Sequence, residues 1–136
     1  MMTVERTREE RQARLYPEGV HVFELPASIY GLREEEDYHD HGRNGLTLVK
    51  NAEVRVLLQV LRQGAGLPEH RAPGPITVQV LDGEIRFETS DEVVYLRRGE
   101  MLSLPAARPH SVEAVEDAAF LVTIAMPPRA GPGSVE

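Results

Sequence analysis

From Leu46 onward, apolar and polar residues alternate one by one, which is typical of β-strands with one buried face. The segment ITVQV is an example, because Ile76, Val78 and Val80 fall on one face and the residues between them on the other. Similar runs are EVRVLLQVL, EIRFET, EVVYL, MLSL, HSVEAV and AAFLVTIAM, and short turn segments separate them. This pattern predicts an all-β domain built as an antiparallel sandwich or barrel.

The strongest turn signal in the chain is Asp82-Gly83, which separates ITVQVL from EIRFET. A two-residue hairpin turn needs positive φ angles, and glycine adopts them without steric cost. We therefore expect the two flanking strands to form a β-hairpin with Asp82 and Gly83 at its tip, and no helix between residues 76 and 89.

The N-terminal part lacks this alternation. Residues 3–15 contain a capping-box pair but no apolar stripe, so they are either a solvated leader or an arm that packs on a partner subunit. Residues 20–44 read as a long connection with one helical turn. The predicted organisation is an N-terminal extension and connection packing on the barrel (1–45), the barrel (46–126) and a flexible tail (127–136).

Length and composition narrow the classes of function. The 136 residues suit one domain, and the absence of cysteine excludes disulfides and thiolate metal sites. A net charge of −7 with scattered basic residues argues against a nucleic-acid partner. The N-terminus is charged, and the chain has no apolar run long enough to cross a membrane. We therefore expect a soluble cytoplasmic protein with no membrane partner.

Histidines are the residues that could carry chemistry. His110 lies in phase with Val112 on the inner face of its strand, so it is expected to point into the barrel. His39 and His41 form a His-x-His that we interpret as part of a polar loop; the alternative is that the connection folds over the barrel mouth and lends a third metal ligand. His21 is expected to be a partly buried strand residue.

The spacing of glycine, histidine and proline resembles the two short motifs of the cupin family. Gly64, His70 and Gly83 fall at the positions of the first motif. Gly99, Pro105 and His110 fall at those of the second. Four motif positions are substituted: Ala72 stands in place of the second histidine, Ile76 of the glutamate, Ala107 of a glycine and Ala114 of an asparagine.

The resemblance implies the cupin double-stranded β-helix, a jelly-roll barrel, here with an N-terminal extension. It also implies a homodimer and a metal site inside the barrel, of which this chain keeps two of the four ligands, His70 and His110. The expected ligand pocket is formed by His70, Ala72, Ile76, Val78, His110 and Val112.

Two imidazoles are fewer donors than the three of a catalytic zinc site, and the isoleucine removes a negative charge. The pair therefore either holds one divalent ion weakly (zinc, manganese, iron or nickel), or is a polar pair satisfied by water or backbone, or grips a ligand carboxylate or hydroxyl directly. Two functions stay open, with no catalytic residue assigned. One is a cupin that binds a small molecule in an apolar pocket, and the other is a metal-dependent oxygenase or isomerase acting on a small metabolite.

Overall fold

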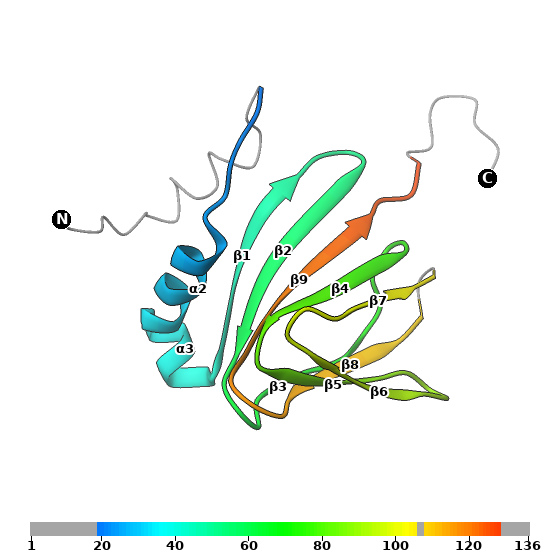
Figure 1. Cartoon of the computed structure of the whole chain (residues 1–136). Helices are drawn as coiled ribbons and strands as arrows, with labels where there is room; N and C mark the ends of the chain where they lie inside the picture. The colour runs from blue at the N-terminus through cyan, green and yellow to red at the C-terminus, as the bar shows by residue number, and fades with distance from the viewer. Residues whose placement is uncertain (1–18, 106–107, 129–136) are drawn as a thin grey trace.

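A computed structural model of the chain describes residues 19–105 and 108–128 (Figure 1). Residues 3–15, interpreted above as a leader or an arm, lie outside these ranges. Within them, two helices precede a series of strands. The elements are α2 (Leu25–Glu34), α3 (Glu36–His41), β1 (Arg43–Lys50), β2 (Val54–Leu61), β3 (Gly66–His70), β4 (Ile76–Asp82), β5 (Glu84–Glu88), β6 (Val93–Arg97), β7 (Met101–Leu104), β8 (His110–Ala114) and β9 (Ala118–Ala125). The barrel part of the chain thus begins with β1 at Arg43 rather than at Leu46.

The strands form two antiparallel sheets that enclose a core between them. One sheet has the order β1-β2-β9-β4-β7 and the other β3-β8-β5-β6. Figure 1 shows the smaller sheet below the larger one, with the helices on the other side of the larger sheet. The predicted all-β jelly-roll fold is confirmed, and residues 76–89 contain no helix.

Residue-by-residue alternation divides the apolar side chains of the larger sheet between two cores. Strand β4 places Ile76, Val78 and Val80 between the sheets, as the sequence predicts. The neighbouring strand β9 does the same with Phe120, whereas its Ala119 lies on the outer face. Since strand side chains point to opposite faces in turn, both faces of this sheet can be apolar only if something covers the outer one.

The outer face is covered by the two helices, and here the sequence interpretation was wrong. Instead of one turn within a long connection, residues 25–41 form α2 and α3, which bury Leu32 and Tyr38 against the outer face of β1, β2 and β9. The acidic run between these two buried residues obscures the helical spacing in the sequence. Helices this short are not stable in isolation, and their burial against the sheet stabilises them.

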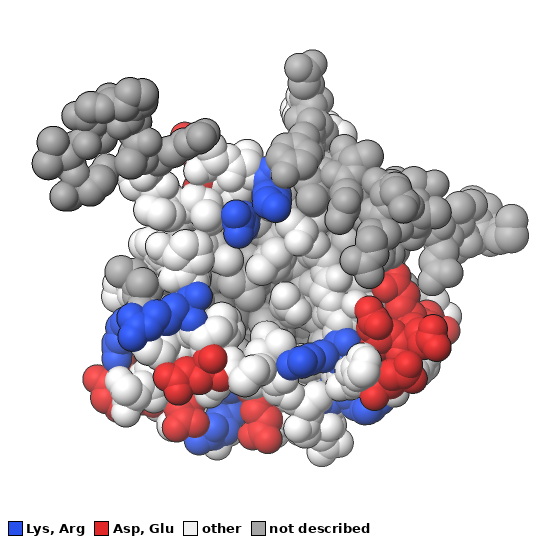
Figure 2. Space-filling view, turned by 180° about the vertical axis from the view of Figure 1, so that it is seen from behind, with Lys and Arg blue, Asp and Glu red and all other residues white. Residues whose placement is uncertain are grey.

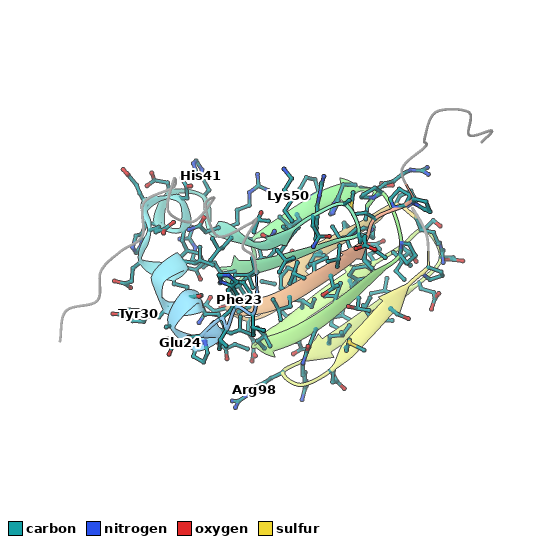
Figure 3. All side chains as sticks on the ribbon, turned by 90° about the horizontal axis from the view of Figure 1, so that it is seen from above. Phe23, Glu24, Tyr30, His41, Lys50 and Arg98 are labelled. Atoms are coloured by element: carbon teal, nitrogen blue, oxygen red, sulfur yellow. The ribbon has the colours of Figure 1, made fainter. Side chains whose placement is uncertain are left out.

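The histidines of the N-terminal part also differ from expectation. His39 and His41 belong to α3 and not to a loop, and both are exposed. Figure 3 shows His41 on the helical side of the molecule. His21 is exposed and lies outside any strand. In Figure 2, acidic side chains gather on the side occupied by α2 and α3, where Glu36 and Asp37 are exposed.

The predicted hairpin at Asp82-Gly83 is wrong, although the turn itself is present. Gly83 has a φ of 73°, but β4 and β5 belong to different sheets, so the chain crosses from one sheet to the other at this glycine. A Cβ on Gly83 would overlap the backbone carbonyl of Asp117. Gly64 and Gly99, with φ of 85° and 88°, mark two further crossings between the sheets. A turn signal in the sequence gives the local backbone conformation but not the strand partner.

Two further findings bear on partners. Each sheet leaves two edge strands, β1 and β7 in one and β3 and β6 in the other. Unpaired edges are the feature that a dimer would cover, and the expected homodimer stays a prediction. In the described ranges, neither helix has the length and apolar character needed to cross a membrane.

Candidate functional site

The fold brings together the two motif histidines. His70 ends β3 and His110 begins β8, and these two strands pair antiparallel with His70 and His110 as register partners. The imidazole centroids are 4.3 Å apart, with 61° between the ring planes. Both residues lie at the end of the sandwich where β7 has ended and β8 begins, and Figure 1 shows this start of β8 at the right.

Both imidazoles are held by the same local contact. The Nδ1 atom of His70 lies 2.9 Å from the carbonyl oxygen of Pro68, and Nδ1 of His110 lies 3.0 Å from that of Arg108. A carbonyl oxygen can only accept, so Nδ1 carries the hydrogen and donates it in each ring. The neutral rings therefore keep an unprotonated Nε2, the nitrogen with which they can bind a metal or accept a hydrogen bond.

The two histidines differ in burial. His110 is 4% exposed and stacks on Phe87 at 5.2 Å between centroids. Desolvation by burial, together with the charge of nearby His70, lowers the pKa of His110, against the opposing effect of its hydrogen bond to Arg108. His70 is exposed. The expectation that both rings lie inside an apolar cavity is therefore wrong for His70, which stands at the rim because β3 is an edge strand.

The other predicted pocket residues are apolar and buried. Ala72, Ile76, Val78 and Val112 are 8%, 3%, 1% and 5% exposed and belong to the core between the sheets. Ala114 is also buried there, whereas Ala107 lies outside the described residues. At the two substituted ligand positions, the side chains thus pack into the core and offer no donor to a ligand.

A metal held by the protein alone does not fit these residues. A catalytic zinc site takes three protein ligands and a structural site takes four. Within residues 19–105 and 108–128, no three His, Cys, Asp or Glu side chains are grouped so that they could hold an ion. The alternative of a third ligand from His39 or His41 is not supported, because α3 packs on the outer face of the larger sheet.

An ion pair beside the site was missed in the sequence. Arg108 pairs with Asp91, which lies in the turn between β5 and β6 and also accepts a hydrogen bond from Thr89. The contact with Arg108, followed by that with Thr89, lowers the pKa of the Asp91 carboxyl. The pair ties this turn to the residue whose carbonyl holds His110. No local sequence pattern predicts this ion pair, because its two residues are 17 positions apart and come together only in the folded protein.

Phe87 was also missed, although the sequence carries a signal for it. It alternates in EIRFET with Ile85, which is buried in the same core. Its strand β5 pairs with β8, and Phe87 is the register partner of Val112. The alternation of residues along β5 predicts that Phe87 lies on the inner face. The contact between Phe87 and His110, however, depends on which strands pair.

Comparisons with known proteins agree with this geometry. The family model described as "Cupin domain" matches residues 57–125. A conserved protein of unknown function from Streptococcus pyogenes is 24% identical, with a TM-score of 0.67, over 83% of this chain and 93% of that one. An RmlC-like cupin protein from Desulfovibrio desulfuricans is 30% identical, with a TM-score of 0.59, over 68% of this chain and 90% of that one.

A third similar structure is an oxalate decarboxylase variant from Bacillus subtilis. It is 20% identical, with a TM-score of 0.58, and the match covers 62% of this chain but 26% of that one, so this likeness concerns the fold alone. No protein among those with curated descriptions matches the chain. The family model spans half of the chain, and Gly64, Gly83 and Gly99 of the motif spacing stand at turns with positive φ. This chain belongs to the cupin family.

Proposed function

We propose that this cupin binds a small molecule around His70 and His110, at the end of its sandwich where β3 ends and β8 begins. The observation that carries the proposal is the pair of adjacent imidazoles with both Nδ1 atoms engaged. Within the described residues, neither Nε2 has a hydrogen-bond partner. Nε2 of His110 is not among the buried, unpartnered side-chain atoms of the described residues, so it is open to solvent and therefore to a ligand.

Apolar side chains lie on the His110 side of this polar pair. Phe87 stacks on His110, and Val112 and Ile76 lie in the core that continues from it. A few polar atoms set against apolar walls are typical of small-molecule sites, where the polar atoms orient the ligand and the walls contribute affinity. We assign no reaction, because the metal-dependent enzyme that remains the alternative would need a third ligand that the described residues do not supply.

The same pair limits what a metal ion can do here. Zinc, manganese, iron or nickel would find two imidazole donors and no carboxylate to offset its charge. We therefore expect weak metal binding that depends on both histidines.

Binding of small molecules at the pair can be tested by NMR with a set of small alcohols, amines and carboxylic acids. We expect compounds that bind to shift the signals of His70, His110 and Phe87. The variant His110→Phe keeps an aromatic ring against Phe87 but lacks Nε2, so it should weaken this binding, whereas the control His39→Ala on α3 should leave it unchanged. Binding that maps to another surface and survives His110→Phe would contradict the proposal.

A further inference from the structure

The hydrogen bonds of the two imidazoles define which ligand chemistry the site can recognise. We propose that the pair accepts hydrogen bonds from hydroxyl groups of an uncharged ligand and discriminates against carboxylates. This inference rests on the proposed function, since it names the class of molecule that the same site binds.

The first step concerns the direction of the hydrogen bonds. The backbone carbonyls of Pro68 and Arg108 occupy the Nδ1 hydrogens of His70 and His110. In a neutral imidazole one nitrogen donates and the other accepts, so each Nε2 presents a lone pair. Two adjacent lone pairs match O–H donors, whereas a carboxylate offers only further lone pairs and would be repelled.

The second step concerns the charge of the ligand. An ion that leaves water for an apolar environment needs a counter-charge, and the positions where the cupin motif has a histidine and a glutamate carry Ala72 and Ile76. The nearby guanidinium of Arg108 is already paired with Asp91. Among Ala72, Ile76 and Arg108, neither an ammonium nor a carboxylate therefore finds an unpaired partner of opposite charge. A hydroxyl satisfies the lone pairs without bringing a charge.

Both histidines make the same hydrogen bond from Nδ1 to the backbone, which argues for a common role. Each ring donates to the carbonyl two residues before it, although one histidine ends an edge strand and the other begins an inner strand. Both rings are therefore fixed with Nδ1 toward the backbone, and both Nε2 atoms are left for a ligand. A ligand with two neighbouring hydroxyls could use both.

The test compares matched probes that differ in one polar group: benzyl alcohol against benzoate, and 1,2-propanediol against propionate. NMR titrations are run at pH 8, above the ordinary pKa range of imidazole. We expect each alcohol to shift the His70 and His110 signals at concentrations about tenfold lower than its acid. His110→Phe should weaken alcohol binding by about threefold to tenfold, the effect of one hydrogen bond, and His39→Ala is the control.

Side-chain ¹⁵N spectra supply an independent readout, because they distinguish protonated from unprotonated ring nitrogens. We expect Nε2 to be unprotonated in both rings, and a hydrogen on either Nε2 would overturn the inference. Acids that bind at the pair as tightly as the alcohols, with binding weakened in His110→Phe, would overturn the inference while the proposed function stands. If no probe binds at the pair, or if binding is unaffected by His110→Phe, both fail.

Discussion

Restoring the two lost motif residues should convert the histidine pair into a metal site. In the variant Ala72→His/Ile76→Glu, a second imidazole and a carboxylate occupy the positions where the cupin motif has them. With His70 and His110, the chain would again have four ligands, enough for a zinc site. The wild type has two in the described residues, so the difference in zinc response between the proteins isolates the effect of the two substitutions.

The magnitude follows from the burial of Ile76, which is 3% exposed. Loss of its buried side chain costs about 1.5–3 kcal/mol, and a carboxyl without a partner costs about 1–3 kcal/mol more. The change at Ile76 should thus cost the metal-free variant roughly 2.5–6 kcal/mol, a large part of the total stability of a typical domain. Zinc at a hundredfold excess over its dissociation constant returns about 2.7 kcal/mol, which raises Tm by roughly 10 °C in a chain of this size.

Thermal unfolding followed by circular dichroism, with zinc and with a chelator, measures this effect. We expect the shift caused by zinc to be small in the wild type and large in the variant. Ala72→His/Ile76→Gln is the matched control, because it has nearly the same shape without the negative charge, and its shift should be smaller. If the double variant does not fold without metal, folding on addition of zinc is the corresponding readout. A double variant that zinc neither folds nor stabilises beyond the wild type would refute the ligand geometry inferred for these positions.

Two further predictions concern stability. Gly99→Ala should cost about 1–2 kcal/mol in the free energy of unfolding, because its φ is 88° but a Cβ there meets open space, whereas Gly83→Ala should cost more, because its Cβ also overlaps the Asp117 carbonyl. Urea denaturation compares the two, and equal costs would contradict the close approach of the Asp117 carbonyl to Gly83. Since burial lowers the pKa of His110, the unfolded chain takes up a proton at higher pH than the folded chain does. The difference in unfolding free energy between wild type and His110→Phe should therefore be constant above the unfolded pKa of about 6.5. As pH falls below that value, toward the lowered folded pKa, the wild type should lose stability relative to the variant. A difference that does not change with pH would contradict the burial of this ring.

Several features could be predicted from the sequence because they depend on neighbouring residues. Alternation placed Ile76 and Val78 on the inner face of β4, and it placed His110 with Val112 on that of β8. The Asp82-Gly83 signal correctly indicated a turn with positive φ. The motif spacing indicated the family and the two histidines that the fold brings together. In each case the information lies within one strand, one turn or one short motif.

Other features were decided only by contacts between distant parts of the chain. Strand β4 pairs with β9 and β7 rather than with β5, and no turn residue specifies that choice. The helices α2 and α3 are stabilised by burying Leu32 and Tyr38 on a sheet whose strands come later in the chain. The exposure of His70 follows from the edge position of β3. Pairing and burial are properties of the assembled sheets, and a local pattern records which face is apolar but not what will cover it.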